Sequence, residues 1–302
     1  MLNDGIPFGD EFNSSALRTP QFCILHSAFC IPWRNAMSVI SKKIEKLEYL
    51  TAEGISVPHC FTTRLGGVST GIFDSLNIAI KEGETEENVR KNIEILGAAL
   101  GFGADDLVLT RQTHSDIVRV VGREDCNGCF HRDYPECDGL VTNAPGVALM
   151  VFTADCTPLL FHDPVTGAVG AAHAGWRGTA AAIGEKVVQA MVREFGSNPA
   201  DIRAAIGPNI GFCHFETDAD VPEAILATYG NEAAAFIERR GEKYFLDIKA
   251  INALSLRRAG VDHIEISDAC TMCRPDRFWS HRVTRGQRGS QGAVICCREV
   301  CR

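Results

Sequence analysis

The chain has 302 residues, of which 45% are hydrophobic and 23% are charged, a composition typical of globular proteins with a large core. Its net charge of -8 argues against sequence-independent binding of nucleic acid, which normally needs a basic face. No apolar run approaches the roughly 20 residues that cross a bilayer, and no signal-peptide pattern opens the chain. Thirteen cysteines, an odd number at irregular spacings, fit a reducing cytosol better than a secreted disulfide framework. We therefore expect a cytoplasmic protein.

Residues 1–36 show no sustained hydrophobic period, so we expect an N-terminal extension with little structure. The remainder, 37–302, has the composition of one domain. No internal repeat, low-complexity tract or Pro/Ser-rich linker divides it. The Gly- and Asn-rich stretch at 62–79 predicts a loop within this domain.

The predicted elements of the domain mix helices and strands. Short apolar runs bounded by turn residues predict two strands within 107–121, around His114, and single strands at 147–152, 158–161, 168–173, 202–207 and 263–267. Helical periodicity predicts helices over 86–101, 178–196, 222–236 and 248–260. In the second of these helices, Thr179 is the predicted N-cap and Gly196 the predicted C-cap. Because helices and strands do not alternate strictly, the predicted fold class is α/β, a single domain with mixed β-sheets flanked by helices.

The runs PLLF and AVGAAH predict a β-hairpin, because HDPVTG between them carries the Asp, Pro and Gly of a tight turn. A turn centred between Pro164 and Val165 would place Cys156 directly opposite His173. Directly opposed residues have Cβ atoms about 4.5 to 5.5 Å apart, close enough for a thiolate and an imidazole to share a metal ion or a proton. A register slip of one residue would turn one of the two to the other face of the hairpin.

His114, in the motif QTHSD, is the best candidate for a third ligand, because it too lies in a polar loop at the junction of apolar runs. Three ligands of the His/Cys/His type leave a fourth zinc position open for water or substrate, as in a catalytic site. Another interpretation stands beside this one. A single cysteine is often a small core hydrophobe, and a lone histidine is often a structural hydrogen-bonding residue.

The motifs TTRLGG, SLNIA, QTHSD, ADC, HAGWRG, IGPNIG and CTMC, in this order, resemble those of the laccase-domain family, which is variously labelled polyphenol oxidase, purine nucleoside phosphorylase and peptidoglycan-editing factor. The resemblance covers roughly residues 57–297. It implies a single-domain α/β fold, a monomer, and a metal site, usually zinc and sometimes copper, with the ligands His114, Cys156 and His173. It also implies phosphorolysis of adenosine, inosine and methylthioadenosine to free base and sugar 1-phosphate, with adenosine deamination as a second activity.

Four further residues make chemical sense for substrates of that kind. Arg177 precedes the predicted helix 178–196, whose N-terminal amides would favour phosphate, and Arg64 in a Gly-rich loop offers a second guanidinium. Each arginine is equally explained as a surface residue. Asp155 is a candidate hydrogen-bond acceptor for a metal-ligating residue, or a proton carrier, or simply a turn former, and Asn77 either contacts substrate or closes its own loop.

A second group of cysteines follows no family pattern. The stretch CNGC at 126–129, with His131 and Cys137, could assemble a structural zinc site together with Cys270 and Cys273. A loop with uncoordinated thiols is the simpler interpretation, because no fixed spacing links these pairs. The sequence Gly-Ser-Gln at 289–291 also lacks an arginine that the resemblance leads us to expect there.

Other functions compete with the phosphorylase. A metal-free hydrolase would use Cys156 as nucleophile and His173 as base, although such an enzyme has no need of His114. Copper oxidation of phenols is disfavoured by the absence of an H-x-H pair among nine dispersed histidines. A peptidoglycan precursor editing hydrolase stays open, and so does a non-enzymatic zinc scaffold, which would need four closed ligands.

Overall fold

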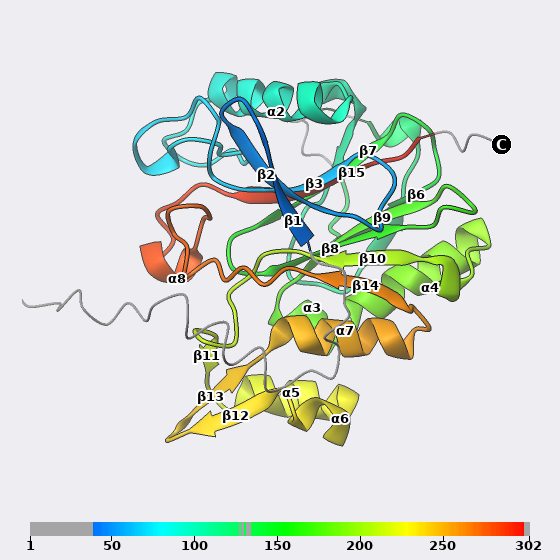
Figure 1. Ribbon diagram of the computed structural model, residues 1–302, viewed down its shortest axis with the longest axis vertical. Helices are drawn as coiled ribbons and strands as arrows, with labels where there is room; N and C mark the ends of the chain where they lie inside the picture. Colours follow the sequence, from blue (N-terminus) through cyan, green and yellow to red (C-terminus); the bar gives the residue numbers. More distant parts are fainter. Residues whose placement is uncertain (1–38, 127, 129, 131–133, 299–302) are drawn as a thin grey trace, which may run out of the picture.

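The computed structural model describes residues 39–298 except 127, 129 and 131–133; the predicted extension over 1–36 lies outside these residues. Two six-stranded mixed β-sheets pack face to face, and helices cover both outer surfaces (Figure 1). The prediction of a single α/β domain with mixed sheets and flanking helices is therefore confirmed. No described helix is long and apolar enough to cross a membrane.

The first sheet has the strand order β1-β2-β3-β15-β7-β4, with the bounds Val39–Ile44, Leu47–Ala52, His59–Thr62, Gln291–Cys296, Ala148–Thr153 and Leu107–Leu109. The second has the order β14-β10-β8-β9-β6-β5, with the bounds His263–Ile266, Arg203–Ile206, Thr157–His162, Val169–Ala174, Gly139–Thr142 and Val118–Val120. The turn from β7 to β8 carries the chain from one sheet to the other. Residues at that turn therefore lie where the two sheets meet.

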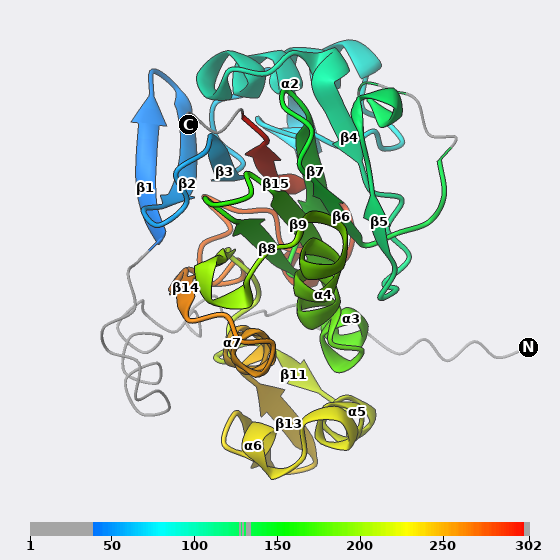
Figure 2. The same ribbon diagram turned by 90° about the vertical axis from the view of Figure 1, so that its right-hand side faces the viewer.

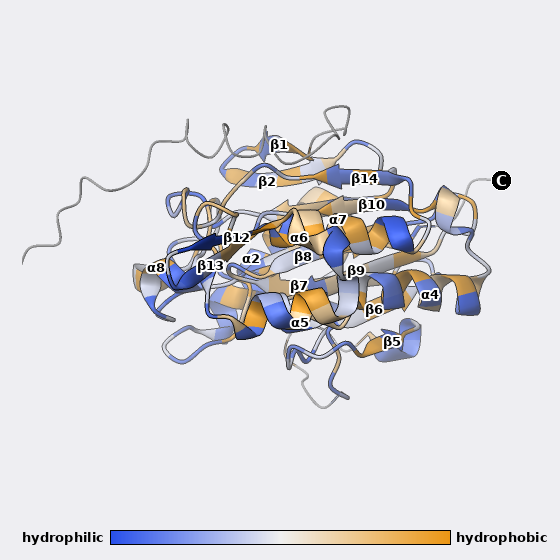
Figure 3. Cartoon of the chain, turned by 90° about the horizontal axis from the view of Figure 1, so that it is seen from below, coloured by the Kyte–Doolittle hydropathy of each residue, from blue (hydrophilic) through white to orange (hydrophobic). Residues whose placement is uncertain are grey.

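Three hydrophobic clusters hold these layers together. Phe61, Leu149 and Leu160 belong to the cluster between the two sheets. A second cluster joins the first sheet to α2 (Glu86–Leu100), and a third joins the second sheet to α4 (Ile183–Phe195) and α7 (Ile248–Arg258). Figure 2 shows α2 on one side of the paired sheets and α4 and α7 on the other. In Figure 3 these two helices carry both hydrophobic and hydrophilic residues along their length, as expected of helices with one buried face.

A smaller unit packs beyond α7. Its hydrophobic cluster includes Ile225, Tyr229, Leu246 and Ile251. It contains α5 (Asp220–Tyr229), α6 (Asn231–Ala234) and a three-stranded sheet of β11 (Glu216–Thr217), β13 (Lys243–Leu246) and β12 (Ile237–Arg240). The remaining short elements are α3 (Trp176–Ala180), α8 (His281–Thr284) and 3-10 turns at Gly71–Phe73, Ala104–Asp106, Arg123–Asp125 and Pro199–Asp201.

Helix ends lie where the sequence provides local capping residues. In α2 the side chain of Thr85 accepts a hydrogen bond from the Asn88 N–H, and Gly101 ends the helix with a φ of 78°. The predicted helix over 178–196 is instead divided. Ala182, with a φ of 56°, separates α3 from α4, and Thr179 lies inside α3 rather than at an N-cap.

The end of the divided helix agrees with prediction, because Gly196 forms the C-cap of α4 with a φ of 71°. The predicted helix over 222–236 is divided in the same way. Its break falls at Gly230, between α5 and α6, where φ is 61° and ψ is -150°. Glycine adopts such a conformation at little cost, so the helical periodicity on either side does not force one continuous helix.

The predicted hairpin of β8 and β9 is confirmed, but its predicted register is wrong by two residues. Pro158, not Cys156, lies opposite His173. The turn is centred between Val165 and Thr166, because the Asp163 carboxylate accepts hydrogen bonds from the backbone N–H groups of both. A slip of two residues keeps the same side of the sheet. The chemical inference drawn from the hairpin therefore survives the error in register.

Asp163 should stabilise this turn strongly, because its buried carboxylate also accepts a hydrogen bond from the Thr166 hydroxyl at 2.7 Å. We expect Asp163→Ala to lower the free energy of unfolding by about 2 kcal/mol, the usual value of hydrogen bonds to a charged group. Urea unfolding followed by circular dichroism measures the effect. Asp163→Asn keeps one acceptor oxygen and should lose less. Equal stability of all three proteins would show that the side chain does not fix the turn.

Candidate metal centre

Three separate segments bring His114, Cys156 and His173 together. His114 lies in the loop after β4, Cys156 in the turn between β7 and β8, and His173 on β9. Their candidate ligand atoms all lie within 4.8 Å of one another. The His114 Nε2 atom is 3.9 Å from the Cys156 Sγ atom, and the two imidazole rings meet edge to face with centroids 4.9 Å apart. Two imidazoles and one thiol thus face a common point.

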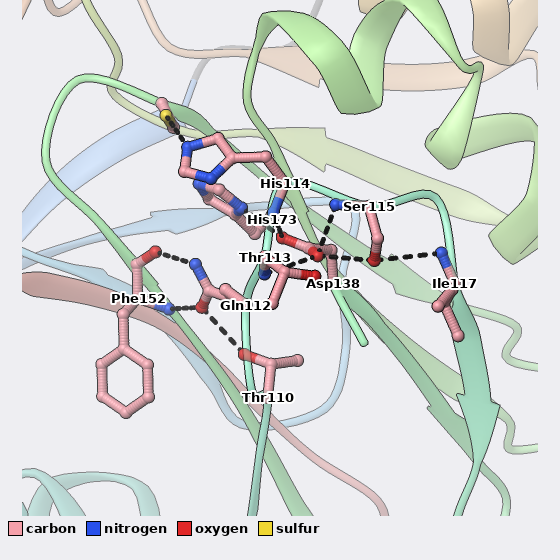
Figure 4. A network of polar contacts seen from close by, with 10 residues as sticks. Thr110, Gln112, Thr113, His114, Ser115, Ile117, Asp138, Phe152 and His173 are labelled. Atoms are coloured by element: carbon pink, nitrogen blue, oxygen red, sulfur yellow. Dashed lines mark hydrogen bonds and ion pairs between the residues drawn. The ribbon is translucent and has the colours of Figure 1, made fainter. Parts of the chain in front are cut away.

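Asp138, just before β6, organises this centre. Its buried carboxylate accepts a hydrogen bond from His173 Nδ1 at 2.7 Å and bonds from the backbone N–H groups of Thr113, His114 and Ser115 (Figure 4). Because Nδ1 of His173 is bonded to the carboxylate, Nε2 is the ring nitrogen left to bind a metal ion. The same carboxylate holds His114 in the left-handed conformation, with a φ of 61°.

Sequence reasoning missed Asp138. The only local signal is an aspartate directly before the apolar strand β6, and such an aspartate is commonly a turn former. Its partners are 23 to 35 residues away along the chain. Their convergence depends on β6 pairing with β9, which no short motif encodes.

The charges at this centre are strongly coupled. Burial raises the pKa of the Cys156 thiol, but the charge of His173 and hydrogen bonds with both histidines outweigh burial and lower that pKa to about 6. Burial lowers the pKa of His173, whereas the Cys156 charge and the Asp138 hydrogen bond raise it to about 9. Burial raises the pKa of Asp138, and hydrogen bonds from His173 and Ser115 bring it down to about 2. Cys156 is therefore a ready thiolate, the form that binds metal ions.

Gly175, at the start of the HAGWRG helix, lies directly against the centre. A Cβ atom at this position would lie 2.8 Å from His114 Cδ2 and 3.3 Å from Cys156 Sγ. Any larger residue would push the histidine and the thiol apart. The glycine therefore keeps the space between the ligand atoms clear.

Asp155 directly precedes Cys156, but its carboxylate bonds residues outside the candidate metal centre. It forms the turn with a φ of 87°. Its buried carboxylate accepts hydrogen bonds from Thr271 Oγ1 at 2.5 Å, Ser280 Oγ at 3.1 Å and the Arg282 N–H at 2.8 Å. Asp155 thus ties the segment 271–282 to the Cys156 turn.

Arg64 and Asn77 are engaged within their own region of the fold. Arg64 donates through Nε and Nη2 to the Asp74 carbonyl and through Nη1 to the Pro275 carbonyl. Its guanidinium also stacks 4.0 Å from the Trp279 ring centroid. The fully buried Asn77 side chain bonds Ala79, Glu84 and Ser290. In the structure Asn77 closes its own loop, the simpler of its two predicted roles.

Arg177 is the second residue of α3, and its exposed guanidinium lies 4.3 Å from the Trp176 ring centroid. The expectation that a long helix begins directly after Arg177 is wrong, because α3 has five residues and α4 begins at Ile183. Phosphate binding through the N-terminus of that long helix therefore has no structural basis. The role of the Arg177 guanidinium in phosphate binding stays a prediction.

A third arginine, Arg288, was missed by sequence reasoning. Burial lowers the pKa of its guanidinium, while the negative charges of Asp155 and Cys156 act in the opposite direction. It donates through Nη1 to Ser290 Oγ at 3.1 Å. Its buried Nε–H has no hydrogen-bond partner among the described residues. Arg288 directly precedes the Gly-Ser-Gln sequence in which an arginine was expected.

A small hollow is lined by part of the centre, and a larger pocket is lined by residues that lie outside it. The smaller, about 70 Å³, is lined by Cys156, Gly175 and Trp176 among others. The larger, about 420 Å³, falls within the usual size of small-molecule pockets. Its lining includes Ile78, Tyr134, Phe152, Gln112 and Ser290. Gln112 is two residues before His114 in the chain and is bonded to Phe152 (Figure 4), and Ser290 is bonded to Arg288.

The alternative in which Cys126 and Cys137 share a zinc site with Cys270 and Cys273 is not found among the residues that the structure describes. Cys126 Sγ donates to the Asp106 carbonyl, and Cys137 is buried in the core between the sheets. Cys129 and His131 lie outside the described residues. Cys270 and Cys273 instead lie beside Cys213 and His214.

Comparisons with known proteins agree with this architecture. A purine nucleoside phosphorylase of Deinococcus radiodurans is 40% identical over 252 residues, covering 82% of this chain and 92% of its own. The purine nucleoside phosphorylase YfiH of Escherichia coli is 35% identical over 226 residues, with 75% and 88% covered. The crystal structure of YlmD from Geobacillus stearothermophilus superposes with a TM-score of 0.80 at 35% identity, covering 86% of this chain and all of that one.

Residues 58–298 also match the family described as multi-copper polyphenol oxidoreductase laccase. This match spans most of the chain and includes His114, Cys156, His173 and Asp138. The resemblance noted in the sequence motifs is thereby confirmed. The chain belongs to the multi-copper polyphenol oxidoreductase laccase family.

Proposed function

We propose that this protein is a zinc-dependent purine nucleoside phosphorylase that converts adenosine, inosine or methylthioadenosine and phosphate into free base and sugar 1-phosphate. The observation that carries the proposal is the convergence of His114, Cys156 and His173, together with a pocket of about 420 Å³ whose lining includes Gln112, two residues before His114. Relatives named purine nucleoside phosphorylase, up to 40% identical, support the substrate class.

The donor set suits zinc. Two imidazole nitrogens and one thiolate are common zinc ligands, and three protein ligands leave a position for water or substrate. A zinc ion held by His114, Cys156 and His173 would supply a Lewis acid. Copper also accepts imidazole and thiolate, but the described residues lack the grouped histidines that multicopper oxidation uses.

The larger pocket has the character of a nucleoside site. Phe152 and Tyr134 provide aromatic surface for a purine ring, and Ile78 adds an apolar wall. The Gln112 amide is held by Phe152 and Thr110, so it stiffens the wall of the pocket. We propose that the base lies against this wall, with the sugar directed toward Cys156 and the two histidines.

Phosphorolysis breaks the bond between C1′ of the sugar and N9 of the base, and a phosphate oxygen forms the new bond to C1′. The electron pair of the broken bond stays on N9, which takes up a proton. Two like charges, on phosphate and on the departing base, must be accommodated close together. We propose that Arg288 binds the phosphate, because its partly buried guanidinium interacts with the charges of Asp155 and Cys156 and retains an Nε–H donor.

The direct test is release of adenine from adenosine by the purified protein, with and without phosphate, followed by chromatography. Release that requires phosphate supports the proposal. Formation of inosine and ammonia in the same samples would establish deamination, which we propose as a second activity because the family resemblance implies it. In deamination, water replaces the amino group at C6 and no phosphate is consumed.

Arg288→Ala should weaken phosphate binding far more than nucleoside binding. We expect the KM for phosphate to rise at least about 10-fold, since a charge-assisted hydrogen bond contributes about 1.5 to 3 kcal/mol. Arg288→Lys keeps the positive charge but lacks the forked donors of a guanidinium. Its KM for phosphate should lie between those of wild type and Arg288→Ala. Steady-state kinetics at varied phosphate measure this. An unchanged KM for phosphate in Arg288→Ala would remove the residue from the phosphate site.

A metal-free cysteine hydrolase is the second candidate, favoured by the contact of the Cys156 thiol with both imidazoles. That enzyme would act on its substrate after complete removal of metal and would be inactivated by alkylation of Cys156. Hydrolysis of a peptidoglycan precursor by a metal-containing enzyme is the third. It would show as metal-dependent activity on muropeptide precursors with no cleavage of nucleosides. All three reactions need Cys156 in its reduced form. We therefore expect the protein to act in the cytoplasm, where thiols are kept reduced.

A further inference from the structure

A second Cys/His group lies outside the proposed active site. Cys213 and His214 follow β10, and Cys270 and Cys273 follow β14. The strands β10 and β14 are parallel neighbours, so their C-terminal ends meet at the same edge of the sheet. The four ligand atoms all lie within 4.8 Å of one another.

The distances within this group are those of a tetrahedral zinc site. Zinc with Zn–S bonds of about 2.3 Å and Zn–N bonds of about 2.0 to 2.1 Å gives S···S edges of roughly 3.8 Å and S···N edges of roughly 3.6 Å. The Sγ atoms of Cys213 and Cys273 are 3.6 Å apart. His214 Nδ1 is 3.2 Å from Cys213 Sγ, 3.7 Å from Cys270 Sγ and 3.4 Å from Cys273 Sγ.

The surroundings of the group also favour bound metal. The backbone N–H of Gly211 donates to Cys270 Sγ at 3.2 Å, a contact that stabilises a thiolate. Three thiolates, one neutral imidazole and one zinc ion carry a single net negative charge. The buried ammonium of Lys249, which donates to the Ser267 and Ala269 carbonyls at 2.7 Å, lies near enough to interact with the charges of Cys270 and Cys213.

We propose that Cys213, His214, Cys270 and Cys273 form a closed structural zinc site, separate from the centre at His114, Cys156 and His173. On binding, each of the three thiols releases its proton to solvent and His214 coordinates as neutral imidazole. Four protein ligands leave no position for substrate, so the role of this site is to hold two loops together.

The loops that this zinc would join support the active-site turn. The Thr271 N–H donates to the Asn209 carbonyl at 2.9 Å, and its hydroxyl donates to Asp155 at 2.5 Å. Asp155 in turn directly precedes Cys156. The structural site therefore positions the loop that anchors the Cys156 turn, without itself contacting the reacting atoms.

The experiment is a zinc determination by mass spectrometry on the full chain, purified without added metal or chelator. Wild type should hold about two zinc ions per chain, and Cys273→Ser about one. Cys126→Ser is the matched control, because Cys126 is a half-buried thiol outside both groups, and it should keep both ions. About one zinc in wild type, unchanged in Cys273→Ser, would overturn the proposal.

Cys156→Ala keeps the test decisive even if Cys273→Ser fails to fold. Only the second site is intact in this variant, so it should retain about one zinc ion, released when a mercurial reagent blocks its thiolates. Replacement of that ion by cobalt should produce the intense thiolate-to-metal absorption of a three-sulfur site. A folded Cys156→Ala protein without metal, or a disulfide between Cys213 and Cys273, would contradict the proposal. None of these readouts depends on phosphorolysis, so the two proposals can fail separately.

Discussion

Replacing Cys156 with alanine is expected to abolish phosphorolysis and to remove about one zinc ion per chain. Only two imidazoles, those of His114 and His173, would remain at the centre, and two ligands hold zinc poorly. We expect kcat/KM for adenosine to fall at least about 1000-fold, equivalent to about 4 kcal/mol of transition-state stabilisation. Kinetics and zinc content should be determined on the same preparation.

Cys126→Ser is the matched control for loss of a thiol, and it should keep wild-type kcat/KM. The far-ultraviolet circular dichroism of Cys156→Ala should match wild type, since the half-buried side chain belongs to none of the four hydrophobic clusters. Full phosphorolysis by a folded Cys156→Ala protein would rule out a catalytic metal at this thiol.

Replacing Asp138 with alanine should impair the centre without removing any of its ligands. The His173 ring would lose the partner that orients it, and the N–H groups of Thr113, His114 and Ser115 would lose their common acceptor. Loss of such an outer partner typically costs 10- to 100-fold in metal affinity or activity. We expect effects of that size on both zinc affinity and kcat. Competition with a chromophoric chelator measures the affinity.

Asp138→Asn keeps the shape of the side chain and removes its negative charge. Its amide can still accept from part of the loop but no longer supplies the negative charge that raises the pKa of His173, so zinc affinity should fall while the fold is kept. Asp163→Asn is the same substitution in the turn that follows β8. It should leave zinc affinity unchanged, because Cys156 lies at the other end of that strand. If Asp138→Ala binds zinc as tightly as wild type, the carboxylate does not position the ligands.

The residues of the candidate metal centre could be predicted because each lies next to a recognisable local pattern. The apolar runs flanking HDPVTG predicted the hairpin, and the hairpin placed Cys156 and His173 on the same side of the sheet. The register itself depends on which backbone N–H groups the Asp163 side chain binds. That choice is a side-chain packing event, and the residue types of the turn permit more than one outcome.

Features that depend on distant pairing could not be predicted. Asp138 reaches His173 through the pairing of β6 with β9. Cys213 reaches Cys270 because β10 and β14 are parallel neighbours in the sheet. The break between α3 and α4 likewise interrupts a run whose periodicity favours one helix. Tertiary contacts there, such as the Asn252 hydrogen bond to Thr179, override the local preference.

The measurement that tests the central claim most directly is phosphorus NMR of wild-type protein incubated with adenosine and inorganic phosphate, beside a Cys156→Ala sample. Phosphorolysis at the His114, Cys156 and His173 centre predicts ribose 1-phosphate from wild type, equal in amount to the adenine released, and none from the variant. Adenine released without ribose 1-phosphate, or ribose 1-phosphate formed equally by the variant, would contradict it.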